Sequence, residues 1–111
     1  MIDVDVARVQ CAQLKTAADG SPVPQLKAWL RALAREWEHA AEDVEGIGGS
    51  IEFVGSIAPG QQVFFTNGYA TDFMTVVRNV RDNCLQLSDP NDARPVYLNR
   101  MSNVSPVVTR A

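Results

Sequence analysis

The chain has 111 residues, of which 46% are hydrophobic and 21% charged, and its formal net charge is −3. These values are typical of one compact domain and exclude a chain that is disordered throughout. A negative net charge argues against a dedicated nucleic-acid binder, which needs a surplus of Lys and Arg to displace counterions from phosphates. We expect a single α+β domain over residues 1–111, with a flexible C-terminal tail from about residue 102.

The beginning of the chain and its overall hydropathy indicate a compartment. Asp3 and Asp5 stand where a secretory signal would have a basic start followed by an apolar run. No stretch reaches the ~18 uninterrupted apolar residues of a membrane span. Arg greatly outnumbers Lys, and Ala and Val are abundant, which favours a GC-rich genome such as that of a bacterium or one of its phages. We therefore expect a cytoplasmic protein that does not contact a membrane.

The first segment, residues 3–18, fits a strand or a helix. Ile2, Val4 and Val6 alternate as in a strand. Residues 7–18, in contrast, are mostly good helix formers. We favour a helix that begins after an aspartate cap and ends at Asp19-Gly20, where glycine can take the left-handed conformation found just past a last helical turn.

The clearest element is an amphipathic helix over residues 24–45. Its apolar residues recur at steps of three and four, so they lie on one face, and Trp29 and Ala40 widen the stripe at its flank. The stripe consists of Leu26, Leu30, Leu33, Trp37, Ala41 and Val44. Pro24 fits the first turn of this helix. Because the connector from the first helix is short, the two helices should pack as antiparallel neighbours.

The charges of this second helix are placed against its macrodipole, which favours acidic residues at the start and basic residues at the end. The basic residues near the start are Lys27, Arg31 and Arg35, and the acidic residues near the end are Glu38, Glu42, Asp43 and Glu45. Two explanations remain open. Tertiary packing outweighs a cost of this size, or the acidic end is kept for a basic partner.

The second half of the chain contains strand and turn signals. Residues 50–57 and 61–67 read as two strands of an antiparallel hairpin joined by Ala58-Pro59-Gly60. Residues 71–87 have a helical apolar face, although their many valines leave a strand open for part of the segment. Residues 95–100 read as a third strand. The expected fold is α+β, with three helices packed on one face of a small, mainly antiparallel three-stranded sheet.

His39, the only histidine, has acidic neighbours at helical spacing, namely Glu36, Glu42 and Asp43. A His and an Asp four residues apart can supply two metal ligands, and a carboxylate can tune an imidazole as a proton carrier. No other part of the sequence supplies further ligands or a nucleophile. We therefore interpret His39 as a surface histidine in an acidic helix face, and we predict no metal and no cofactor.

Two other patterns are weak as functional signals. The glycines of residues 46–49 superficially resemble a phosphate-binding loop, but they follow a helix and precede a strand, which is the wrong context. Cys11 and Cys84 form no C-x-x-C pair. We expect two buried free thiols, although a disulfide between them remains open.

The aromatic residues suggest contact surfaces. Trp29 and Trp37 lie about 12 Å apart along one helix, and Trp29 stands at the margin of the stripe, so it is the better candidate for a partner-facing anchor. Phe64 and Phe65 must point to opposite faces of a sheet. If helices cover one face, one of these rings, beside Tyr69, is left for a partner, unless the C-terminal tail covers it.

The function that these features favour is a non-enzymatic protein–protein interaction module, such as an adaptor, an inhibitor or an assembly subunit. Its partner would be another protein or a second copy of the chain, and we predict no catalytic residues. The predicted contact residues are Trp29, Phe65, Tyr69, Tyr97, Glu38 and Glu42. An exposed edge strand offers a further docking mode by strand addition.

Two alternative functions remain open. One is a small-ligand-binding protein or small enzyme, with a pocket between sheet and helices lined by Tyr69, Tyr97 and His39. The other is weak nucleic-acid contact through the arginines of the C-terminal half, namely Arg78, Arg81, Arg94 and Arg100.

Overall fold

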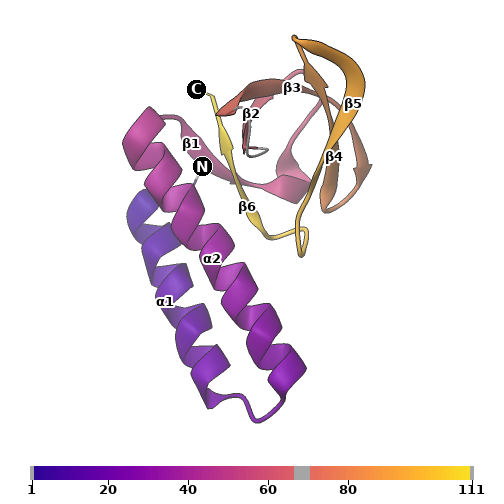
Figure 1. Ribbon diagram of the computed structural model, residues 1–111. Helices are drawn as coiled ribbons and strands as arrows, with labels where there is room; N and C mark the ends of the chain where they lie inside the picture. The colour runs from indigo at the N-terminus through magenta and orange to yellow at the C-terminus, as the bar shows by residue number, and fades with distance from the viewer. Residues whose placement is uncertain (1, 67–70, 111) are drawn as a thin grey trace.

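The computed structural model describes residues 2–66 and 71–110. Within them, a helical hairpin precedes an antiparallel sheet (Figure 1). The helices are α1 (Val4–Gly20) and α2 (Pro24–Ile47), and a short 3-10 helix, η1, spans Val54–Ser56. The strands are β1 (Ser50–Phe53), β2 (Gln62–Thr66), β3 (Thr71–Arg81), β4 (Cys84–Asp89), β5 (Asp92–Asn99) and β6 (Pro106–Thr109).

The six strands form one sheet in the order β1-β6-β2-β3-β4-β5, and every neighbouring pair is antiparallel. The sheet curls, so that β4 and β5 come round over the face opposite the helices (Figure 1). Two apolar clusters result. One joins the helices to Ile51 and Val108, and the other fills the inside of the curled sheet around residues such as Val63, Leu85 and Leu98.

The helical hairpin forms for reasons that are local in sequence. The Asp3 side chain accepts a hydrogen bond of 2.9 Å from the Asp5 backbone N–H and so caps α1. Pro24 occupies the first turn of α2. Ala7, Cys11 and Ala18 of α1 are buried against α2, and these small side chains let the two helices approach closely. The predictions of both helices and of their antiparallel packing are confirmed.

Three exposed ion pairs cross between the helices. Arg8 Nη2 lies 2.6 Å from Glu45 Oε1, Arg31 Nη2 lies 3.2 Å from Asp19 Oδ1, and Lys15 Nζ lies 3.8 Å from Glu38 Oε2. Each contributes little stability because both partners are solvated. These pairs nevertheless engage several charged side chains for which the sequence alone indicated no partner within the chain, including Glu38.

The hairpin is longer than the sheet that it packs on. Helix α2 contacts β1 and β6, and the end of the hairpin that carries the α1–α2 turn projects past the strands (Figure 1). The buried residues of α2 therefore include Leu33, Trp37, Ala40 and Ala41. Nearer the start of the helix, the same side of α2 has no strand beneath it.

The expectation of three helices on a three-stranded sheet is wrong: the described structure has two helices and a six-stranded sheet. The segment expected as a third helix, residues 71–87, forms β3, a turn at Asp82-Asn83 and the start of β4. Met74 and Val76 point inward while Val77 lies exposed. The high density of β-branched residues, a strand signal, outweighed the helical spacing.

The predicted hairpin between residues 50–57 and 61–67 is also wrong in its pairing. Strand β6 lies between β1 and β2 and pairs with both, and Val54–Ser56 turn away as η1. Nothing local in the sequence places β6 there, because its partners come from more than 40 residues away. The segment from about residue 102, expected to be a flexible tail, thus contains a strand of buried residues.

Candidate functional site

The most distinctive site of the molecule is a polar hollow between α2 and the curled sheet. It has a volume of about 320 Å³ and continues inward as a smaller chamber of about 80 Å³, which reaches Glu36. The side chains around the larger part are His39, Glu42, Asp43, Phe64, Phe65, Leu98 and Arg100.

The hollow exists because β2 leaves β6. The two strands pair at a single position, Val63 with Thr109, so the second half of β2 diverges from its neighbour. Phe64 packs toward the helices and Phe65 toward the inside of the sheet. Adjacent residues of a strand point to opposite faces of the sheet. Both rings can therefore line one hollow only if the hollow extends around the edge of β2 where this strand is no longer paired with β6.

One flank of α2 supplies the acidic wall. Trp29, Glu36 and Asp43 are seven residues apart, so they lie almost in line along the helix. Trp29 lies beyond the sheet, whereas Glu36 and Asp43 face it and line the chamber with His39. The margin of the apolar stripe, where Trp29 lies, therefore also carries the carboxylates of Glu36 and Asp43, which lie between α2 and the sheet.

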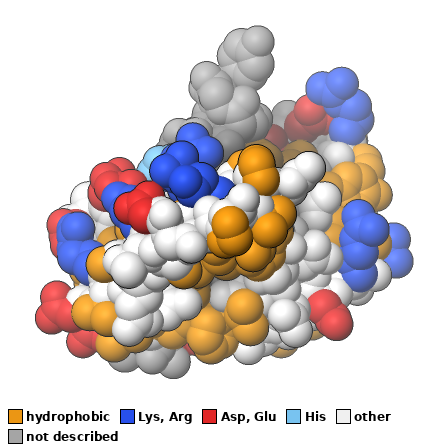
Figure 2. All heavy atoms as spheres, turned by 90° about the horizontal axis from the view of Figure 1, so that it is seen from below, with side chains coloured by type: hydrophobic (Ala, Val, Ile, Leu, Met, Phe, Trp, Pro, Cys, Tyr) orange, Lys and Arg blue, Asp and Glu red, His pale blue; other side chains and the backbone are white. Residues whose placement is uncertain are grey.

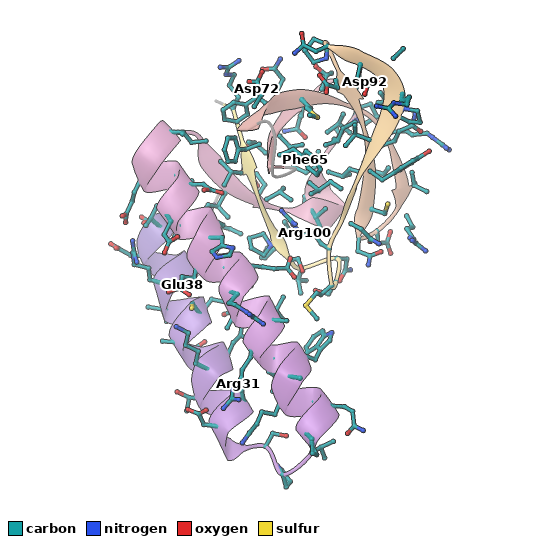
Figure 3. The ribbon with its side chains drawn as sticks, in the orientation of Figure 1. Arg31, Glu38, Phe65, Asp72, Asp92 and Arg100 are labelled. Atoms are coloured by element: carbon teal, nitrogen blue, oxygen red, sulfur yellow. The ribbon has the colours of Figure 1, made fainter. Side chains whose placement is uncertain are left out.

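The opposite wall carries Arg100, whose backbone is fixed by the turn between β3 and β4. The Arg100 N–H donates to the Asn83 carbonyl oxygen at 2.8 Å, and the Asn83 side-chain amide donates to the Arg100 carbonyl oxygen at 2.7 Å. With both backbone groups held, the Arg100 side chain extends between α2 and the sheet (Figure 3).

Arg100 and Glu36 form a mostly buried ion pair. Arg100 Nε lies 3.5 Å from Glu36 Oε2, and the side chains are 31% and 16% exposed. Burial raises the pKa of Glu36, and the nearby Arg100 opposes this rise. Burial also lowers the pKa of Arg100. Both shifts show that the pair is held in a poorly solvated place, where each charge depends on the other.

This pair lacks good hydrogen bonds. Among the described side chains, Glu36 Oε1, Glu36 Oε2 and Arg100 Nε are buried and make no hydrogen bond of good geometry, although the Met101 backbone and the Ser105 side chain lie close enough to Glu36 to lower its pKa. Buried carboxylates normally accept several hydrogen bonds, and an unsatisfied one is costly. All three unsatisfied atoms of the described part therefore fall in one place, next to the hollow.

Asp43 is a second carboxylate with a raised pKa. Burial raises its pKa, the positive field of His39 opposes the rise, and the negative field of Glu42 adds to it. Within residues 2–66 and 71–110, no group of three or more His, Cys, Asp or Glu is arranged to hold a metal ion. The acidic side chains of the hollow and its chamber are Glu36, Glu42 and Asp43.

A second feature is the apolar surface of the projecting hairpin end, which we call the overhang and define as Val23, Leu26 and Trp29. These side chains are 47%, 46% and 39% exposed. Leu26 and Trp29 are three residues apart near the start of α2, so they are neighbours on its surface, and Val23 is the N-cap residue just before the helix. Figure 2, seen from the end at which the hairpin projects, shows hydrophobic side chains gathered near the middle of that face.

The structure separates the other predicted contact residues. Phe65 lies at the wall of the hollow and Glu42 at its mouth. Tyr97 is 50% exposed on edge strand β5, and Glu38 is paired with Lys15 of α1. Tyr69 lies outside the described residues. The five described residues of the predicted contact set thus fall on different surfaces, and among these five only Phe65 and Glu42 come together.

The arginines of the C-terminal half are engaged within the chain at three positions. Arg100 is paired with Glu36 as above, Arg78 Nε donates to Gln86 Oε1 at 2.7 Å, and Arg94 Nη2 lies 2.8 Å from Asp92 Oδ2. Arg100 is mostly buried, whereas Arg78, Arg81 and Arg94 are exposed, and nucleic-acid contact through these arginines stays a prediction. Both cysteines are buried free thiols.

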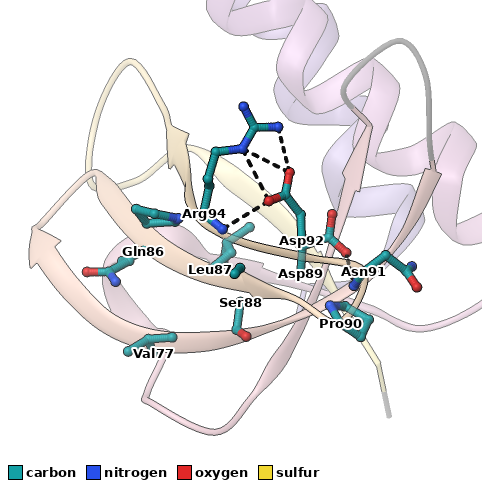
Figure 4. A pocket seen from close by; sticks show the side chains of 11 residues that line it. Val77, Gln86, Leu87, Ser88, Asp89, Pro90, Asn91, Asp92 and Arg94 are labelled. Atoms are coloured by element: carbon teal, nitrogen blue, oxygen red, sulfur yellow. Dashed lines mark hydrogen bonds and ion pairs between the residues drawn. The ribbon is translucent and has the colours of Figure 1, made fainter.

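A surface depression of about 620 Å³ surrounds the turn between β4 and β5 (Figure 4). Its polar groups serve the turn itself. The Asp89 carboxylate accepts from the Asn91 N–H at 2.9 Å, and Asp92 accepts from the backbone and side chain of Arg94, which lowers the pKa of Asp92 to about 2. We therefore regard this depression as a structured turn rather than a site.

Phe65 and Glu42 were predicted as contact residues, whereas the other side chains of the hollow described above were not, namely Glu36, His39, Asp43, Phe64, Leu98 and Arg100. The sequence does give an indication of Glu36 and Asp43, because their spacing puts both residues on the same flank of α2 as Trp29. Nothing local pointed to Arg100, whose position depends on the pairing of distant strands.

Comparison with known proteins adds no relative: no family model, curated protein or solved structure matches this chain. Among the described helices, none combines the length and the apolar character needed to cross a membrane.

Proposed function

We propose that this chain is a non-enzymatic protein–protein interaction module that docks through the overhang of its helical hairpin. The observation that carries this proposal is the division of one helical stripe into a covered and an uncovered part. Leu33 and Trp37 are buried under the sheet, with 5% and 4% exposure, whereas Leu26 and Trp29 on the same side of α2 remain 46% and 39% exposed.

The chemistry of the overhang suits a protein partner. Trp is among the residues that contribute most to binding at protein interfaces, and Arg is another. Arg31 lies across the helix from Trp29, where it pairs with Asp19 of α1, so the surface of the overhang itself is apolar. Apolar surface on a projecting, rigid element can be covered by a second molecule without any rearrangement of the fold. The partner is another protein or a second copy of the chain.

The test is affinity capture from the source cells with matched variants of the full chain. Trp29→Ser combined with Leu26→Ser removes the apolar surface of the overhang. Val77→Ser combined with Val80→Ser removes similar exposed apolar area from β3, where the two valines are 47% and 41% exposed.

The proposal expects one protein, or the chain itself, to be captured by the wild type and by the β3 variant but not by the overhang variant. Equal capture by the two variants, at equal folded fractions, would show that the overhang does not bind. Light scattering after size exclusion separates self-association from binding of another protein.

A second candidate function is binding of a small ligand in the hollow between α2 and the sheet. The observation that favours it is the hollow of about 320 Å³ itself, which has the polar side chains His39, Glu42, Asp43 and Arg100 in its lining.

A further inference from the structure

We propose that the partner of the overhang is a second copy of this chain, which packs antiparallel and seats the tip of its own hairpin against the end of the sheet. The inference rests on the proposed function and names the partner of the same surface. In a two-fold dimer of this kind the same patches meet on both copies, so every contact occurs twice.

A second uncovered apolar surface lies at the end of the sheet nearer the projecting part of the hairpin (Figure 1). A hollow of about 290 Å³ opens there between β1, η1 and the loop that leads into β6. Its lining includes Phe53, Asp82 and Val104, which we call the shelf. The Phe53 side chain is 39% exposed and the Val104 side chain 52%.

The overhang and the shelf form the two sides of one corner. The ring of Phe53 packs edge-on against Trp37 of α2, with 6.1 Å between the ring centroids. Trp29 precedes Trp37 by eight residues, which is about 12 Å along the helix axis. The shelf therefore stands about two turns of α2 past the overhang. A partner that covers both surfaces needs a narrow projecting end, and the hairpin of this chain has one (Figure 1).

The length of the overhang fits a second copy. In the antiparallel dimer, Leu26 of each copy meets Trp29 of the other. Val23 then lies about 7 Å beyond the two-fold axis, and Trp37 of the other copy, at the level of Phe53, lies about 14 Å beyond it. The remaining distance of about 7 Å is close to the 8–10 Å at which packed helices lie, with one layer of interdigitated side chains between them. The tip thus reaches the shelf without a clash.

Charge favours the same arrangement. Asp82 is exposed, and it is the only charged side chain among the described residues that line the shelf hollow. The tip carries Lys27 and Arg31, of which Arg31 is paired with Asp19, so its excess charge is positive. Opposite charges at the margin of an interface set the orientation of the two molecules more than they raise the affinity.

The experiment is sedimentation velocity on the full chain over a concentration range of about 1–500 µM. The overhang and the shelf are small compared with a standard interface of about 800 Å² per partner, so we expect a reversible dimer with a Kd of about 1–100 µM. Trp29→Ser should raise this Kd at least about tenfold and Val104→Ser at least about threefold. Val77→Ser, which removes a valine of 47% exposure from β3, should leave it unchanged.

Crosslinking tests the seating of the tip on the shelf. A Val23→Cys chain is mixed with a Val104→Cys chain, and a bismaleimide with a short spacer is added, so that only contacts between two copies are captured. The native Cys11 and Cys84 are buried and stay unreactive in the folded chain. We expect a crosslinked dimer from this mixture and much less from Val23→Cys mixed with Val77→Cys.

Three results would overturn the inference. They are a monomer at every concentration, a Kd that Val104→Ser and Val77→Ser change equally, and equal crosslinking of positions 104 and 77 to position 23. The proposed function fails by a different result, namely loss of any difference between the overhang and β3 variants in affinity capture. A monomeric chain whose overhang captures another protein would thus overturn the dimer and leave the docking function standing.

Discussion

Replacing Arg100 by methionine should destabilise the fold in a way that depends on pH. The substitution keeps an unbranched side chain but leaves the Glu36 carboxylate buried without its cation. Removing one partner of a buried ion pair typically costs about 3–5 kcal/mol. Arg100 is 31% exposed and Glu36 16%, so water compensates part of the loss, and we expect about 2–3 kcal/mol at pH 7.5.

The sign of the pH dependence follows from the raised pKa of Glu36. The folded state binds this proton more tightly than the unfolded state, so the group's contribution to stability falls as pH rises through the folded pKa. Arg100 limits that rise, and its removal should raise the pKa of Glu36 further. At acidic pH the protonated carboxyl needs no counterion, so the cost of Arg100→Met should shrink to about 1 kcal/mol of lost packing and hydrogen bonding.

Urea unfolding of wild type and variant at pH 7.5 and pH 5.0 measures both costs. With a slope of about 1–3 kcal/mol per molar urea, the midpoint should fall by about 1 M at pH 7.5 and by less at pH 5.0. The double variant Glu36→Gln, Arg100→Met removes the buried charge and should recover most of the loss. An equal cost at both pH values, or a cost below about 0.5 kcal/mol at pH 7.5, would refute the buried-pair argument.

The two tryptophans should differ sharply in the same unfolding assay. Trp37→Ala, at a buried position, should cost about 3–5 kcal/mol, and Trp29→Ala less than about 1 kcal/mol; similar losses would make Trp29 a core residue. Gly49 has φ +95°, and a Cβ there meets the carbonyl oxygen of Thr109, so Gly49→Ala should destabilise by more than about 1 kcal/mol. Gly46→Ala, with open space around the added methyl group, should stabilise α2 by about 0.5–1 kcal/mol, and a loss there would contradict the assigned helix end.

The hairpin of α1 and α2 was predictable because its signals are local. The caps at Asp3 and Pro24 and the stripe through Leu33 and Trp37 lie within one helical segment each, and no distant residue is needed to interpret them. Helical spacing and short connectors determine how such a pair packs.

The sheet was less predictable because its pairing is non-local. Residues 71–87 satisfy a helical period and a strand period at once, and only burial against β2 and β5 decides between them. The position of β6 between β1 and β2 has no local signal. The tail from about residue 102 looks extended and flexible in sequence, yet it supplies the buried Val107 and Val108.

The hollow illustrates how a site can be partly visible in sequence. The acidic cluster around His39 was recognised, and Phe65 was recognised as an aromatic without a clear place in the core. Their meeting depends on the divergence of β2 from β6 and on Arg100, which the β3–β4 turn holds from 17 residues away. Neither feature has a signature that a single sequence displays.

The central claim is that the overhang of α2 contacts a second molecule in the cell. Site-specific photo-crosslinking in the source cells tests this most directly, with a benzophenone side chain placed at position 26 and, as control, at position 77. The account predicts a discrete adduct from position 26, with another protein or a second copy, which disappears when Trp29→Ser is added. Identical adducts from both positions, or none from position 26 while the protein remains folded, would contradict it.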